Sequence, residues 1–261
     1  MTGVLSTFRD IFIPLIIKET SERECTDMSA IIDAVAKFDW SPFWISLKTG
    51  LVATFICFFL GVFVARQVIK LPHKVKSVVD SILTLPMILA PTVSGFFLLL
   101  LFSLRRPLGA WMYETLNIKV VQTWLGCIIA ASVISFPLMY RNARAAFEQV
   151  DVNLIYAART LGMKESKIFW RVLLPAAGPG IVSGTVLTFA RALGEYGATS
   201  MLAGNIAGKT GTISQRIANV IKDGDYLTAG IWCIIMMIIA VIIITVTNLI
   251  TGKGLKKTQR W

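Results

Sequence analysis

Side chains that could do chemistry are few in this sequence, and none is placed to form a catalytic or metal centre. The one histidine, His73, has no second candidate ligand near it in the sequence. No CxxC pair occurs among the four cysteines, which are Cys25, Cys57, Cys127 and Cys233. An enzyme would need a Ser/His, paired-carboxylate or metal constellation. We therefore expect no catalytic residues and no metal ligands.

One segment imitates a phosphate-binding loop, because Gly204 and Gly208 are followed by Lys209 and Thr210. The ATP-binding motif needs four residues between its glycines, and it lies between a strand and a helix. This segment has three intervening residues and no such surroundings. We interpret it as a flexible loop and expect no ATP or magnesium to bind to this chain.

The elements that must position the remaining polar groups are apolar and long. The 261 residues are 55% hydrophobic and only 16% charged, with a mean hydropathy of +0.70. Such a composition excludes a secreted disulfide scaffold and a disordered chain, and uninterrupted apolar runs exclude a β-barrel. Five runs approach the roughly 20 residues that cross a bilayer. We predict an all-α integral membrane protein with five core transmembrane helices, at about 45–66, 82–104, 120–140, 172–195 and 226–252.

The net charge of +11 lies mostly on one side of these predicted spans. Residues 66–81, 141–171 and 253–261 carry 14 lysines and arginines against four acids. Loops rich in Lys and Arg stay in the cytoplasm. We therefore predict a cytoplasmic C-terminus and an outer N-terminus, and the flanking position of the basic residues argues against nucleic-acid binding.

The predicted domains follow from the same pattern. Residues 1–40 form an extracytoplasmic extension without a signal-peptide pattern, and apolar residues at helical spacing near its end indicate a short interfacial helix. The transmembrane domain covers residues 41–255 and includes a cytoplasmic loop at 141–175. A basic cytoplasmic tail, 256–261, completes the chain.

The cytoplasmic loop is patterned as two short helices. Asp151 is placed to cap a helix that runs to Leu161, and Gly162 stands at its C′ position. Apolar side chains repeat on one face of that helix, at Leu154, Ala157, Ala158 and Leu161. We predict a second amphipathic helix over 164–174 that ends at Pro175 and turns three apolar side chains toward the membrane, namely Ile168, Phe169 and Val172.

These residues carry a family resemblance. The spacing of Tyr156-Ala157-Ala158, Gly162, Val172 and Leu174-Pro175 resembles the EAA loop of permease subunits of ABC importers. Tyr156 stands where that loop has Glu, and Val172 stands where it has Ile. The flanking segments 135–140 and 189–199 resemble molybdate permeases, with sulfate and thiosulfate permeases close behind. The resemblance covers about residues 41–255.

The resemblance implies a type I ABC importer permease in the cell (inner) membrane that works as a homodimer. Two ATPase subunits, which carry the ATP and magnesium, would dock on the two cytoplasmic loops, and an oxyanion-binding protein would dock outside. Loop residues that match the motif or flank it are expected to couple the ATPase to transport: Asp151, Tyr156, Ala157, Ala158, Arg159, Gly162, Leu174 and Pro175.

Two charged residues at the end of the fourth span, Arg191 and Glu195, have two interpretations. They form a structural ion pair, or Arg191 gives positive potential to an anion path while Glu195 holds the helix end and Thr188 and Thr199 supply hydroxyls. The transported anion would be molybdate, with sulfate, thiosulfate or tungstate as alternatives. A self-sufficient secondary transporter is a different class, which usually has ionisable residues in several spans.

Small residues in the second and fourth spans also have two interpretations. They permit close approach of helices, either within one subunit or across a two-fold axis between two copies. The sequence does not separate these alternatives. The residues concerned are Ala90, Ser94 and Gly95 in the second span and Ala176, Gly178, Gly180, Ser183 and Gly184 in the fourth.

Overall fold

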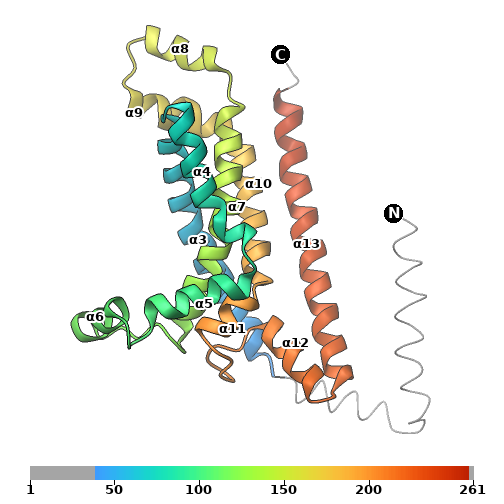
Figure 1. Ribbon diagram of the computed structural model, residues 1–261. Helices are drawn as coiled ribbons and strands as arrows, with labels where there is room; N and C mark the ends of the chain where they lie inside the picture. The colour runs from blue at the N-terminus through green and yellow to red at the C-terminus, as the bar shows by residue number, and fades with distance from the viewer. Residues whose placement is uncertain (1–38, 259–261) are drawn as a thin grey trace. The chain divides into compact units, whose positions relative to one another are not determined.

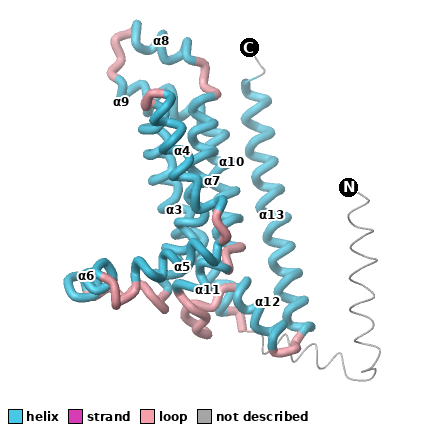
Figure 2. Tube along the Cα trace, viewed as in Figure 1, coloured by secondary structure: helices cyan, strands magenta, loops and turns pink. Residues whose placement is uncertain are grey.

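A computed structural model describes residues 39–258, and every regular element within them is a helix (Figures 1 and 2). This confirms the prediction of an all-α membrane protein. The predicted interfacial helix before the first span lies outside the described residues. The division of the chain into an extension, a transmembrane domain and a tail stays a prediction.

Four helical segments within the described residues are long and apolar enough to cross a membrane, and a bent pair of helices makes a fifth candidate. The bent pair is α4 (His73–Ile88) and α5 (Pro91–Phe102). The four others are α3 (Ser41–Ile69), α7 (Trp124–Glu148), the run Glu165–Leu193, and α13, whose described helix is Tyr226–Thr258. The described part of the chain therefore contains four candidate spans, and a fifth if the bent pair is counted as one.

The predicted second span, 82–104, is wrong as a single helix. α4 begins at His73, inside the predicted loop 66–81, and the chain bends by 104° before α5. A residue that precedes proline is pushed out of the α region, and Ala90 before Pro91 is extended, with φ −56° and ψ 136°. Hydropathy hides this break because both pieces are apolar.

The predicted helix over 164–174 is also wrong at its end, because it does not stop at Pro175. α9 (Glu165–Ile168) continues through a π-helical turn, η2 (Phe169–Leu173), into α10 (Leu174–Leu193). The Leu174 N–H donates to the Phe169 carbonyl, five residues back. The wider turn accommodates a proline, which lacks an N–H and clashes with a tighter turn.

The third span is shifted from its predicted position. Residues 120–123 are not helical, and α7 runs eight residues beyond the predicted end at 140, to Glu148. Thr123 is extended, with φ −130° and ψ 165°, so the helix begins only at Trp124. The added turns carry charge, and an ion pair between Arg144 and Glu148 at i,i+4 supports them, with Nε–Oε1 at 3.0 Å.

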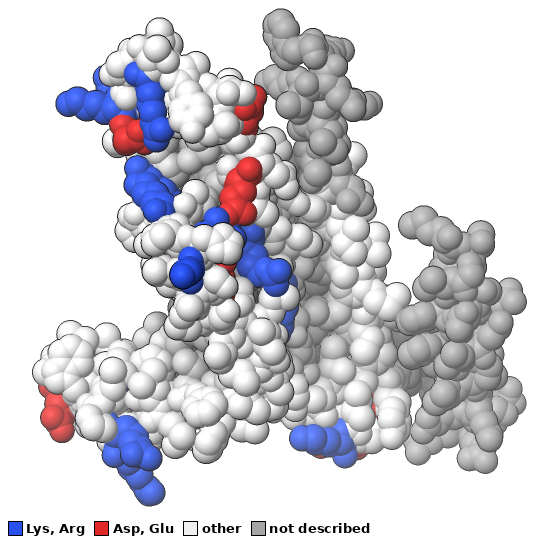
Figure 3. Space-filling model, turned by 45° about the horizontal axis from the view of Figure 1, so that its top comes forward, with Lys and Arg blue, Asp and Glu red and all other residues white. Residues whose placement is uncertain are grey.

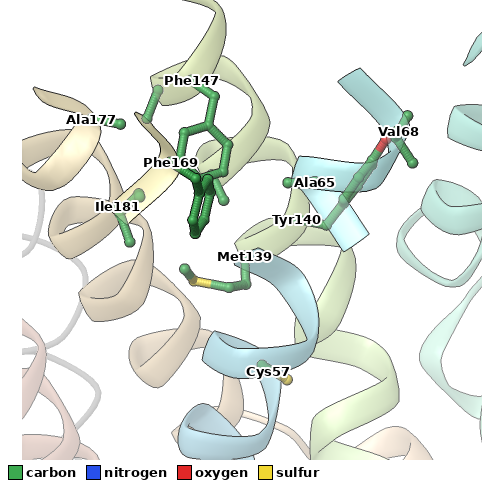
Figure 4. Close-up of a cluster of buried hydrophobic side chains, with 11 residues drawn as sticks. Cys57, Ala65, Val68, Met139, Tyr140, Phe147, Phe169, Ala177 and Ile181 are labelled. Atoms are coloured by element: carbon green, nitrogen blue, oxygen red, sulfur yellow. The ribbon is translucent and has the colours of Figure 1, made fainter. Parts of the chain in front are cut away.

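α7 is the central helix of the bundle and packs on α3, α4 and α10. A core lies between these helices toward the α8 end (Figure 4). In it the Phe147 ring of α7 and the Phe169 ring of η2 lie with centroids 5.8 Å apart. Met139 and Tyr140 are fully buried beside them. A second core toward the other end joins α7 to α5 and to α11 (Gly197–Leu202).

Short helices lie together at each end of the bundle. α8 (Val152–Thr160) and α9 lie at one end. The opposite end carries three short helices: α6 (Pro107–Leu116), α11 and α12 (Ile213–Lys222) (Figure 1). The residues of 66–72 and 149–164 thus share one end, as the charge pattern predicts for one side of the membrane.

Close packing within the subunit explains part of the small-residue pattern. A Cβ added to Gly184 would lie 2.5 Å from the Asn142 Cβ of α7, and one added to Gly180 would lie 2.7 Å from the Ala146 Cβ. Gly178, on the same helix, has nothing within 4 Å of its added Cβ. Gly180 and Gly184 therefore serve the contact between α10 and α7.

This packing predicts opposite effects for two matched substitutions in α10. Gly184→Ala should push α10 away from Asn142 and cost about 1–3 kcal/mol. Gly178→Ala should be neutral or stabilising, because alanine is the better helix former and meets no neighbour. Thermal unfolding of the detergent-solubilised protein measures both. Equal melting temperatures for the two variants would contradict the close contact between α7 and α10.

Candidate functional site

α8 is a short helix with sequence-encoded ends. Asp151 is its N-cap, and the carboxylate accepts a hydrogen bond from the Asn153 N–H at 2.9 Å. Such a cap satisfies one of the amides that the first turn leaves free. The predicted helix over 151–161 and its capping residue are confirmed.

Gly162 ends α8 as predicted. Its φ is +71°, in the left-handed region that glycine adopts without strain. The Gly162 N–H donates to the Arg159 carbonyl at 2.9 Å, and the Met163 N–H donates to the Ala158 carbonyl at 3.2 Å. This pair of bonds is a Schellman motif. The motif reverses the chain so that α9 returns toward the bundle.

The apolar residues of α8 differ in their exposure to solvent. Ala158 is 5% exposed and faces the bundle. Leu154, Tyr156 and Leu161 are 49%, 55% and 81% exposed. Ala157 is exposed as well. α8 therefore presents apolar side chains at the end of the molecule, which is typical of a surface that a partner covers.

Arg159 is held on this surface by two contacts. Its Nε donates to Glu165 Oε1 at 2.7 Å, and its guanidinium carbon lies 5.8 Å from the centre of the Tyr156 ring. The hydrogen bond to Glu165 raises the pKa of Arg159 above its ordinary value. The ring of Tyr156 thus contacts the cation from the position where the EAA motif has an acid.

The loop is anchored to the bundle through Phe169. Its ring packs on Phe147, and the guanidinium of Arg66, near the end of α3, lies 3.9 Å from its centroid. Ile168 is 2% exposed and Phe169 6%. The prediction that these side chains turn toward the membrane is wrong, because both are buried in the protein. The fourth span and the loop are thereby joined in one packed unit with α3 and α7.

Arg191 and Glu195 lie together at the end of α10. The Arg191 guanidinium donates to Glu195 Oε2 at 2.8 Å, and Glu195 Oε1 accepts from the Ala198 N–H at 2.8 Å. The side chain of Glu195 is 2% exposed and that of Arg191 is 37% exposed. This pairing is the one that the structural interpretation describes, and Glu195 also holds the start of α11; the role of Arg191 in an anion path stays a prediction. Solvent reaches this pair mainly at the exposed part of Arg191.

The two threonines predicted beside this pair are enclosed. Thr188 is 0% exposed and donates to the Gly184 carbonyl at 2.7 Å. Thr199 is 1% exposed and donates to the Glu195 carbonyl at 3.2 Å. Their hydroxyl hydrogens are therefore used within the protein. Their role in an anion path stays a prediction.

Sequence reasoning missed an ionic cluster between α4 and α7. Arg144 pairs with Asp80, whose carboxylate also accepts from the Tyr140 hydroxyl. Lys76 pairs with Glu148. Figure 3 shows basic and acidic side chains together toward the α8–α9 end, on a surface that is otherwise mostly uncharged. The sequence did carry a signal for this cluster: Lys76 and Asp80 are four residues apart on α4, and Arg144 and Glu148 are four residues apart on α7. The assignment of 66–81 as a loop concealed it.

Within residues 39–258, no three His, Cys, Asp or Glu side chains come together as a metal site. Three places follow from the described residues as candidates for function: the exposed face of α8, the Arg191–Glu195 pair and the ionic cluster. The first exposes apolar side chains, the second lies where α10 ends and α11 begins, and the third ties α4 to α7.

Comparison with protein families gives a match to the family described as "Binding-protein-dependent transport system inner membrane component", over residues 57–252. The matched region includes α8, Gly162 and the Arg191–Glu195 pair.

Several curated proteins are similar over most of their length. The molybdenum transport system permease protein ModB of Escherichia coli K12 is 39% identical over 211 residues, which cover 80% of this chain and 92% of that protein. A putative molybdenum transport system permease of Bacillus subtilis, YvgM, is 32% identical over 204 residues, covering 77% and 88%. The sulfate transport system permease protein CysT of Escherichia coli K12 is 31% identical over 216 residues, covering 78% of each chain.

Solved structures share the fold at low sequence identity. A chain of the inward-facing MetNI methionine ABC transporter aligns with a TM-score of 0.65 and 18% identity, over 82% of this chain and 94% of that one. A chain of a bacterial ABC transporter that imports alginate aligns with a TM-score of 0.71 and 15% identity, over 97% and 93%. Both confirm the fold of an ABC importer permease.

Proposed function

We propose that this chain, which belongs to the family of binding-protein-dependent transport system inner membrane components, forms the membrane path of an ABC importer for molybdate. The assignment of molybdate as the substrate rests on the 39% identity with ModB over 92% of that protein. The identity with the sulfate permease CysT is 31%. Sulfate is therefore the second candidate, and tungstate, which shares molybdate's tetrahedral shape, stays open with it.

Coupling to ATP hydrolysis is assigned to α8 and Gly162. An ATPase subunit would cover the exposed apolar side chains Leu154, Tyr156 and Leu161, with the exposed Arg159–Glu165 ion pair beside them. Movement of that subunit would reach the fourth span through Phe169, because α9, η2 and α10 form one unbroken run. ATP can shift the balance between two conformations only through contacts that differ between them, and α8 supplies such contacts.

The assembly would contain two copies of this chain, two ATPase subunits and an outer oxyanion-binding protein. Five candidate spans make a thin bundle, and a path for a solute forms most simply between two copies related by a two-fold axis. We place the α8–α9 end in the cytoplasm because the basic loops lie there. The C-terminus is then inside, the N-terminus outside, and Arg191 lies near the outer mouth of the path.

Reconstitution tests this function directly. The chain should be purified with its ATPase subunit, placed in proteoliposomes and supplied with the cognate binding protein. We expect ATP-dependent uptake of radiolabelled molybdate, with weaker competition from sulfate. Uptake that prefers sulfate would reassign the substrate. Uptake without the ATPase subunit would instead identify a self-sufficient secondary transporter and overturn the proposal.

The geometry of Gly162 predicts a loss of coupling when a β-branched residue replaces it. Gly162→Val would place such a residue at φ +71°, at a cost of about 1–2 kcal/mol, and would misdirect α9. Nothing lies within 4 Å of an added Cβ, so the effect comes from backbone strain alone. We expect transport to fall while membrane insertion stays intact.

Gly162→Asn is the matched control, because asparagine tolerates the left-handed conformation, and it should keep most of the uptake. Arg159→Glu should weaken binding of the ATPase subunit, since it reverses charge on the exposed face. Normal uptake and normal ATPase binding in both Gly162→Val and Arg159→Glu would remove the loop from the coupling mechanism.

The two interpretations of the Arg191–Glu195 pair predict different uptake when both charges are removed. The double variant Arg191→Gln/Glu195→Gln leaves no lone charge, so dimer formation and ATPase binding should persist. If Arg191 supplies potential to the anion path, uptake should nevertheless stay low, and measuring uptake beside assembly separates the two. Full uptake by the double variant would show that the pair is structural only.

A further inference from the structure

The apolar contacts of α4 do not specify how far this helix is shifted along its neighbours. No residue of α4 is buried, and Val79 and Leu83 are the apolar side chains that pack, partly buried, on the core around Phe169. Val75 precedes Val79 by four residues, and Met87 follows Leu83 by four. A slip of one helical turn would therefore put one apolar side chain in the place of another.

The polar contacts between α4 and α7 are ordered along both helices. Lys76 pairs with Glu148, and Asp80, one turn further along α4, pairs with Arg144, one turn back along α7. The two helices are therefore antiparallel, and each charge lies opposite a charge of the other sign. The four side chains are between 21% and 40% exposed, and partly buried pairs are screened less than exposed ones.

This order of charges opposes a slip in either direction. Helices that slide past one another can do so by a whole turn, which is about 5.4 Å. A slip one way would bring Lys76 opposite Arg144. A slip the other way would bring Asp80 opposite Glu148. Each places like charges together, which is destabilising, although the apolar spacing of α4 would permit both.

Tyr140 adds a neutral contact to the same arrangement. Its side chain is fully buried, and its hydroxyl donates to the Asp80 carboxylate. The slip that carries Asp80 to Glu148 would take this acceptor away. A buried hydroxyl without a partner is costly, so that slip is opposed by a lost hydrogen bond as well as by charge.

We propose that the four charged residues of the ionic cluster, Lys76, Asp80, Arg144 and Glu148, fix the register of α4 on α7, and that transport requires this register. Polar side chains within an apolar contact fix register in coiled coils in the same way. α4 leads directly into the break at Leu89–Ala90, so its register sets where α5 begins relative to α7. The part that concerns transport rests on the proposed function, and the register itself does not.

The test exchanges charges without changing the composition of the chain. Lys76→Asp/Asp80→Lys reverses the order of charges on α4 alone, and Arg144→Glu/Glu148→Arg reverses it on α7 alone. Either exchange sets like charges opposite each other in the native register and favours a slip of one turn. The combination of all four substitutions restores attraction in the native register. Because the net charge beside the spans is the same in every variant, the charge bias that orients the chain is kept.

We expect each single-helix exchange to lower the melting temperature of the full chain in detergent by at least about 4 °C. In proteoliposomes with the ATPase subunit and the binding protein, ATP-dependent molybdate uptake should fall at least about fivefold. The four-residue exchange should return the melting temperature to within about 2 °C of the unmodified protein and recover at least about half of its uptake.

A neutral variant, Lys76→Gln/Asp80→Asn, separates register from lost attraction. It leaves Arg144 and Glu148 paired with each other, with Nε–Oε1 at 3.0 Å, and it sets no like charges together. It should therefore lower the melting temperature and uptake less than Lys76→Asp/Asp80→Lys does. Equal losses in these two variants, or normal uptake and melting temperature in both single-helix exchanges, would overturn the register role.

The four-residue exchange decides the remaining outcomes. If it recovers neither the melting temperature nor the uptake that the single-helix exchanges lose, the register role is wrong. If it recovers the melting temperature alone, the requirement of this register for transport is wrong. Absence of molybdate uptake by the unmodified complex would contradict the proposed function, and the melting temperatures of the same variants would still test the register.

Discussion

A hydrocarbon bilayer offers no partner to a backbone N–H or C=O, and this constraint governs the rest of the structure. It explains why the described part of the chain folds into helices, in which each peptide group finds its partner four residues away. It also makes every departure from regular helix informative. The two departures within the spans are the π-helical turn at Phe169–Leu173 and the break at Leu89–Ala90. At the π-helical turn, the backbone groups form hydrogen bonds with each other within the helix. At the break, one backbone amide has no hydrogen-bond partner within the described residues.

Side-chain chemistry then decides how the helices pack on each other. Lipid tails are as apolar as leucine, so helices associate through close packing and polar contacts. α7 shows both: Gly184 of α10 lets the backbones approach at Asn142, and Asp80 of α4 pairs with Arg144. The apolar contacts join α7 to the span that follows the loop, and the ionic contacts join it to the broken span. α7 thus holds the loop and the break in one framework.

Local signals predicted the parts of the molecule that local interactions determine. Apolar runs indicated five spans, and the cap at Asp151 and the left-handed turn at Gly162 were readable because each lies within a few residues of its partner. The passage of a helix through Pro175 was not, because proline normally ends a helix and the π turn depends on Phe169 packing against the bundle. The pairing of Asp80 with Arg144 joins residues 64 apart, and the four-residue spacing on each helix went unrecognised because 66–81 was assigned as a loop.

The positions of the loop and the break within the fold have a mechanical consequence. One helical run, Glu165–Leu193, begins at the surface proposed for the ATPase and ends two residues before Glu195, which holds α11. Gly197 of α11 in turn rests against Thr92 at the start of α5. A displacement of the loop would be carried along this continuous run to the contact between α11 and α5. Packed interfaces change between discrete arrangements and do not deform continuously, so a tilt of α10 would repack the contact between α11 and α5 as a step.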